Sequence, residues 1–184
     1  MSKNLKLITI IAVRHGESRH NVLTIVNGDP KKQFHLTPKG KKQAQSLVKK
    51  LSSKNIDVIF ASQMLRTQET ARPLAKIKKI KIKIDKRLND IHAGKLEGIN
   101  IWEFRKITHN GDNSVQGSEN IISLAKRIKS FLNDITKKYP GKVVMVVSSE
   151  IILHLLRQIA AGKKPDDSKG RLLKNAMVYS FKID

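Results

Sequence analysis

The sequence predicts an α/β fold, a three-layer α/β/α sandwich with a mainly parallel central sheet, in a single domain of residues 1–184. Short apolar, β-branched segments alternate with longer segments whose apolar residues recur at helical spacing. This alternation is typical of parallel sheets that are covered by helices on both faces. The length suits one domain, and no internal repeat or low-complexity linker divides the chain. Ligands are therefore expected beyond the carboxyl ends of the strands.

Five segments are predicted to be strands. The strongest signal, residues 142–148 (KVVMVVS), is a nearly unbroken apolar run, as in strands that are buried on both faces. Residues 7–13 (LITIIAV) and 58–61 (VIFA) have the same character. Isoleucine alternates with lysine in residues 80–84, which indicates a strand with one solvated face near the edge of the sheet. The last predicted strand covers residues 176–181.

Segments with a helical period separate these strands. Residues 38–53 form an amphipathic helix, with Thr37 as its N-cap and Pro38 at its first position. The longest apolar stripe, over residues 118–138, predicts a second helix. The two other expected helices cover residues 64–75 and 151–161.

The composition indicates an anionic ligand. There are 37 Lys and Arg residues against 15 Asp and Glu residues, a formal net charge of +22. Such a surface attracts nucleic acid, acidic membranes and phosphorylated metabolites. Aromatic residues make up only 4% and are not interleaved with basic ones, so stacking platforms for single-stranded nucleic acid are lacking. Charge alone does not choose among these anions, but the composition disfavours nucleic acid as the primary ligand.

The sequence contains no Cys, which excludes a disulfide framework, a thiolate nucleophile and a Cys-containing zinc site. No segment approaches the roughly 18 apolar residues of a membrane span. The first apolar run leads into Arg14 rather than into a small-residue cleavage site, so it is not a typical signal peptide. We expect a cytoplasmic protein that needs no membrane, metal or cofactor. The oligomeric state is left open.

Polar residues suited to phosphoryl transfer follow three of the predicted strands. Arg14 and His15 come after the first strand, Ser62 and Arg66 after the second, and Asp90 after the third. Two guanidiniums can bind the oxygens of a phosphoryl group, and an imidazole can attack its phosphorus. A carboxylic acid can protonate the departing oxygen. Together these residues predict phosphoryl transfer without a metal ion.

The same segments resemble the histidine phosphatase (phosphoglycerate mutase-like) superfamily. The resemblance covers nearly the whole chain and rests mainly on residues 14–18 (RHGES), 62–71 (SQMLRTQETA) and 88–98 (LNDIHAGKLEG). It implies that His15 is transiently phosphorylated, that Arg14 and Arg66 clamp the phosphate, and that Asp90 is the acid. The family more often has Glu at the position of Asp90, so the side chain of this acid is one methylene shorter.

The resemblance also implies which residues surround the substrate. We expect substrate-binding roles for Asn21, Ser18, Glu17, His92 and Ser149, with Trp102 near the mouth of the pocket. His92 is equally consistent with packing inside its own loop. The remaining histidines are expected to be structural or exposed, namely His20, His35, His109 and His154.

The chain departs from the family after its strongest strand. The family has a second His followed by Gly there, whereas this sequence has Ser149 followed by Glu150. A Ser hydroxyl can donate a hydrogen bond but carries no positive charge. Loss of one transition-state donor typically lowers the rate by about 10²- to 10³-fold. The carboxylate of Glu150 would repel a phosphate unless it turned away, so slow turnover or none is expected.

The leading interpretation is a metal-independent phosphomonoester hydrolase that acts through phospho-His15. Ser149 and Glu150 are also consistent with a catalytically weak pseudo-phosphatase that only binds a phosphorylated ligand. A phosphoglycerate mutase is less favoured, because mutases usually have Arg at the position of Ile91 and carry an additional basic segment. A basic nucleic-acid-binding protein with the same fold is the remaining alternative.

Overall fold

The computed structural model describes residues 7–109, 117–165 and 173–184. In this part of the chain a five-stranded sheet has the order β3-β2-β4-β1-β5. Four of its strands run parallel, and the fifth pairs antiparallel with β1. In chain order the strands are β1 (Ile8–Arg14), β2 (Val58–Ala61), β3 (Ile82–Ile84), β4 (Val143–Ser148) and β5 (Val178–Ile183). The mainly parallel sheet is confirmed, and β3 lies at an edge as predicted.

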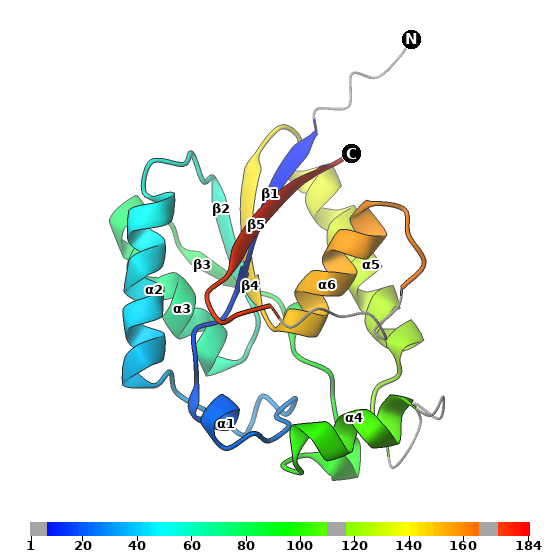
Figure 1. Cartoon of the computed structure of the whole chain (residues 1–184). Coiled ribbons are helices and arrows are strands. Elements are labelled where there is room, and N and C mark those ends of the chain that lie inside the picture. The colour runs from blue at the N-terminus through cyan, green and yellow to red at the C-terminus, as the bar shows by residue number, and fades with distance from the viewer. Residues whose placement is uncertain (1–6, 110–116, 166–172) are drawn as a thin grey trace.

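Helices cover both faces of the sheet and complete the predicted three layers (Figure 1). One face carries α2 (Pro38–Leu51) and α3 (Leu65–Lys78), and the other carries α5 (Ile121–Lys138) and α6 (Glu150–Ala160). No helix in the described part of the chain is long and apolar enough to cross a membrane.

Neighbouring residues of β1 show how the sheet divides the core. Ile10 packs in one apolar cluster with Phe131 of α5, and the next residue, Ile11, packs in another with Leu47 of α2 and Leu74 of α3. Each of these side chains is at most 5% exposed. Because β1 is packed from both faces, the position of its carboxyl end is fixed.

The predicted helix and strand bounds differ from the observed ones at several ends. The helix predicted to begin at residue 118 begins at Ile121, because the Asn120 side chain caps it by accepting from the Ser123 N–H. The last strand begins at Val178 rather than at Ala176, which has a left-handed backbone with φ of 57°.

Two helices were not predicted, α1 (Arg19–Val22) and α4 (Ile101–His109). Both lie at the end of the sheet where the parallel strands finish (Figure 1). No helix is predicted for residues 101–109, although Ile101 and Phe104 have helical spacing. Phe104 packs into a small apolar cluster of its own with Val26, Ala93 and Leu96. This cluster anchors α4 beside the ends of the strands.

The register of the sheet aligns the carboxyl ends of β1, β2 and β4. Arg14 of β1 lies opposite Ser148 of β4, and Ala61 of β2 lies opposite Val147 of the same strand. The residues that follow these strands therefore begin along a single line, where the sequence predicts the chemistry.

Candidate active site

A cavity of about 640 Å³ lies at this end of the sheet. Residues around the ends of β1 and β4 line it, together with side chains from α4, from α6 and from the segment after β3. The lining includes Arg14, His15, Asn21, Asp90, Trp102, Ser149 and Glu150. Most of the predicted site residues are thus brought together, and Arg66 lies behind the lining in contact with Asp90.

His15 is held with one ring nitrogen available for attack. The ring is 1% exposed, and its Nδ1–H donates to the carbonyl oxygen of Gly16 at 2.7 Å. Because a carbonyl only accepts, Nδ1 carries the proton and Nε2 keeps its lone pair. Burial lowers the pKa of His15 well below its ordinary 6.5, and the charges of Arg66 and Arg14 lower it further. The imidazole is therefore neutral at neutral pH, as a nucleophile must be.

The loop after β1 is positioned by close contact with two helices. The N–H of Gly16 donates to the Thr70 hydroxyl of α3 at 2.9 Å. A Cβ on Gly16 would lie 2.7 Å from the carbonyl oxygen of Gly40, and a Cβ on Gly40 would lie 1.9 Å from that of Glu17. Only glycine fits at both positions, so the backbone that follows His15 lies directly against the start of α2.

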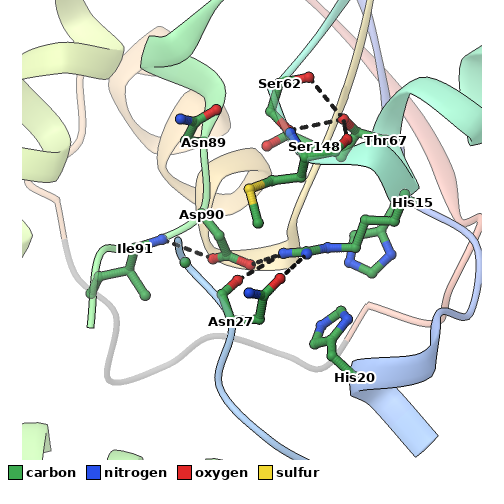
Figure 2. Close-up of polar contacts among 12 residues, drawn as sticks. His15, His20, Asn27, Ser62, Thr67, Asn89, Asp90, Ile91 and Ser148 are labelled. Carbon is green, nitrogen blue, oxygen red and sulfur yellow. Dashed lines mark hydrogen bonds and ion pairs between the residues drawn. The ribbon is translucent and has the colours of Figure 1, made fainter. Parts of the chain in front are cut away.

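Arg66, in the first turn of α3, is 1% exposed and fully oriented. One guanidinium nitrogen donates to the Asn27 side chain at 2.6 Å. The other donates to the Asn27 carbonyl at 3.0 Å and to the Asp90 carboxylate at 3.1 Å. Figure 2 shows Asn27 and Asp90 close to each other, and the side chains of both accept from Arg66. Asn27 was missed in the sequence because its partner lies in a distant segment.

The Asp90 carboxylate lies between Arg66 and the cavity. One oxygen accepts from Arg66, and the other accepts from the N–H of Ile91 at 2.9 Å (Figure 2). Arg127 of α5 donates to the Asp90 carbonyl at 3.1 Å and fixes the backbone at this point. The loop after β3 thereby places the Asp90 carboxyl group in the cavity lining, next to Arg66.

Arg14 is tied to the segment that leads into β5 and to α6. Its guanidinium donates to the carbonyl oxygen of Leu173 and lies 3.4 Å from the carboxylate of Glu150. Glu150 has therefore not turned away from the cavity, and it pairs with one of the two predicted phosphate-binding arginines.

Within the described ranges, three buried side-chain atoms have no hydrogen-bond partner, namely Nε of Arg14, Nε of Arg66 and Oγ of Ser149. Buried polar atoms are nearly always paired, so each such exception needs an explanation. All three can donate, and they belong to residues of the same site. A phosphoryl group could accept from these donors. Across residues 7–109, 117–165 and 173–184, no group of three His, Asp or Glu side chains is arranged to hold a metal ion.

Ser149 and two histidines complete the lining. Ser149 is the N-cap of α6 and is 5% exposed. His154, expected to be structural or exposed, lines the cavity one turn further along α6. His20 is buried and also lines the cavity, with its ring centroid 5.5 Å from that of His15 (Figure 2). Burial lowers the pKa of His20 to about 2, so this ring is neutral too.

Two of the predicted substrate-binding residues orient His20. The hydroxyl of Ser18 is hydrogen-bonded to His20 Nδ1, and the Asn21 amide donates to His20 Nε2 at 3.1 Å. Asn21 also lines the cavity, and its side-chain amide oxygen accepts from the Asn175 side chain at 3.4 Å. Ser18 is completely buried, which indicates a positioning role.

Glu17 and His92 are directed elsewhere. The Glu17 carboxylate accepts from the Thr37 hydroxyl at 2.8 Å and from Lys39 at 2.7 Å. His92 is exposed, and its Nδ1 accepts from the N–H of Gly94 at 3.2 Å within its own loop. The structure does not bring these two side chains to the cavity lining. Ile91, next to His92, lines the cavity, but the Glu17 and His92 side chains bond to partners outside it.

The fold and the site together define an α/β protein with a cavity at the carboxyl ends of its parallel strands, lined by a buried histidine and by Arg14. The family model of the histidine phosphatase superfamily (branch 1) matches residues 10–184, and the chain belongs to this superfamily. The resemblance seen in the sequence motifs is thus confirmed.

Similar proteins include both phosphatases and mutase-like proteins. Phosphoserine phosphatase 1 of Hydrogenobacter thermophilus is 31% identical over 79% of this chain and 72% of its own length. Phosphoglycerate mutase-like protein 4 of Arabidopsis thaliana is 26% identical over 99% and 82%. The solved phosphoserine phosphatase of Entamoeba histolytica, in complex with 3-phosphoglyceric acid, has a TM-score of 0.80 at 24% identity and covers 95% of this chain and 90% of its own.

Proposed function

We propose that this chain is a metal-independent phosphomonoester hydrolase in which His15 transiently carries the phosphoryl group. The observation that carries the proposal is the set of buried, unpartnered donors beside a neutral imidazole, with those of Arg14 and Ser149 on residues of the cavity lining and that of Arg66 behind it, next to Asp90. Preorganised donors of this kind stabilise the charge that develops on a transferred phosphoryl group. The guanidiniums would supply the positive charge that other phosphatases take from metal ions.

The proposed reaction has two steps. In the first, Nε2 of His15 attacks the phosphorus, the bond to the ester oxygen breaks, and Asp90 in its acid form protonates that oxygen. In the second, water attacks the phosphohistidine, Asp90 takes a proton from the water, and inorganic phosphate leaves. His15 is regenerated, so atoms and charges balance over the cycle.

The proposed substrate is a small phosphorylated molecule in the cytoplasm. The name of the relative from Hydrogenobacter makes phosphoserine a first compound to assay. The cavity of about 640 Å³ also leaves room for a substrate larger than phosphoserine. Trp102, which is 53% exposed, forms part of its wall. A hydrolase is favoured over a mutase because Ile91, rather than Arg, follows Asp90.

A second candidate function is a binding module for a phosphorylated ligand. It is favoured by the pairing of Glu150 with Arg14 and by the absence of a second histidine at position 149. Such a protein would use the same pocket without efficient chemistry.

Phosphate release from p-nitrophenyl phosphate and from phosphoserine tests the proposal. We expect slow release whose rate is unchanged when EDTA is added, because the arginines supply the charge. Loss of activity in EDTA that added metal restores would contradict the proposal. Binding of phosphate without release from any compound would favour the binding module.

A further inference from the structure

Glu150 is a charged residue of the cavity that the proposed reaction does not use. One carboxylate oxygen accepts from the N–H of Leu173 at 2.9 Å, and the other lies 3.4 Å from the Arg14 guanidinium. The Glu150 side chain is 15% exposed. The Glu150 carboxylate therefore pairs with the guanidinium to which a phosphoryl group would bind. Both side chains line the same cavity.

Charged and titratable groups from several elements surround Glu150. Arg14 of β1 and Arg105 of α4 favour its ionised form, and the negative charge of Asp90 opposes it. His154 lines the cavity one turn further along α6, and His15, His20 and Glu119 line it from other elements. Burial is the largest influence and raises the pKa of Glu150 above its ordinary value, while Arg14 is the main influence in the opposite direction.

A bound phosphoryl dianion changes this balance in two ways. Its oxygens compete with Glu150 for the guanidinium of Arg14, which weakens the influence that keeps the carboxylate ionised. Its own charge lies beside a carboxylate in a largely buried site, where repulsion between like charges is strong. A protonated Glu150 removes the repulsion, and its O–H can then donate to an oxygen of the dianion.

We propose that Glu150 takes up a proton when a dianion binds to Arg14, so that anion binding in this cavity is linked to proton binding. The proposal rests on the proposed function only for the position of the phosphoryl group. By linkage, a site that gains a proton on binding holds its ligand more tightly at low pH. The affinity falls as the pH rises, by up to about tenfold per pH unit for one proton.

Calorimetric titration with sulfate tests this proposal, because sulfate remains a dianion between about pH 5.5 and pH 8 and any proton taken up belongs to the protein. Titration in two buffers of different ionisation enthalpy gives the number of protons directly. Chloride keeps the ionic strength constant, so that the general attraction of a chain with net charge +22 does not vary. We expect the wild-type protein to take up a substantial fraction of one proton for each sulfate.

The matched variants are Glu150→Gln and Glu103→Gln. Gln at position 150 can still accept from the N–H of Leu173, but it cannot repel the dianion. We expect it to lose at least about half of the proton uptake and to bind sulfate roughly tenfold more tightly at pH 8. Glu103 is exposed on α4 and is not part of the cavity lining, so its variant is expected to behave as wild type.

Two results would overturn the proposal and leave the proposed function intact. The first is sulfate binding by the wild-type protein without proton uptake, a result that needs no variant. The second is full uptake in Glu150→Gln, which would assign the proton to another group of the cavity, such as Asp90 or a histidine. Failure of the wild-type protein to bind sulfate or phosphate would contradict both this proposal and the anion site of the proposed function.

Discussion

Replacement of His15 by Ala is expected to lower phosphate release by at least about 10³-fold, because the nucleophile of the covalent step is lost. The two arginines remain, so phosphate binding is expected to persist. Initial rates with p-nitrophenyl phosphate, together with calorimetric phosphate binding, separate these two effects. A variant that binds phosphate without turnover would match the account.

His35→Ala is the control for this experiment. The His35 side chain is 73% exposed and pairs with Glu69 outside the cavity, so this variant is expected to keep the wild-type rate. Wild-type turnover in His15→Ala would show that the reaction does not pass through a phosphohistidine.

Replacement of Ser149 by His is expected to raise turnover by about 10²- to 10³-fold, the usual effect of one transition-state donor. Ser149 lines the cavity at the start of α6, where its Oγ has no partner among the described residues, so an imidazole there would face the phosphoryl position. The measurement is the initial rate of phosphate release with and without the substitution.

Two further variants make this result specific. Ser149→Ala is expected to be slower than wild type, because it removes the hydroxyl donor. The double variant with His15→Ala is expected to be as inactive as His15→Ala alone, since the new imidazole assists the same nucleophile. An unchanged rate in Ser149→His would mean that the departure from the family at this position does not limit the reaction.

Much of the fold could be predicted because burial leaves a strong pattern in the sequence. The apolar run of β4 arises because the strand is buried on both faces, and the apolar stripe of α5 arises because one side of the helix is buried. The short helix α4 was missed because its apolar residues pack into a small separate cluster with Ala93 and with Val26, which is distant in the sequence. A stripe of only nine residues gives a weak periodic signal.

The central site residues could be predicted because parallel strands bring their carboxyl ends together. Arg14 and His15 follow β1, and the segments after β2 and β3 supply Arg66 and Asp90. Asn27 could not be found in this way, since its contact with Arg66 spans 39 positions and depends on the path of a loop.

The directions of side chains could not be predicted from the sequence either. Glu17 is close to the site residues in sequence, yet it turns toward Thr37 and Lys39. Glu150 was expected either to repel a phosphate or to turn away, and it pairs with Arg14 in the cavity. Local sequence fixes neither direction, because the partners come from other elements of the fold.

Trapping the phosphorylated protein shows whether His15 carries the phosphoryl group. The protein is mixed with substrate, quenched in alkali, where phosphohistidine is stable, and digested for mass spectrometry. We expect one phosphoryl group on His15, which is lost on mild acid treatment and is absent from the His15→Ala variant. A phosphoryl group on a serine or aspartate, or steady phosphate release without any phosphorylated protein in wild type or Ser149→His, would contradict the account.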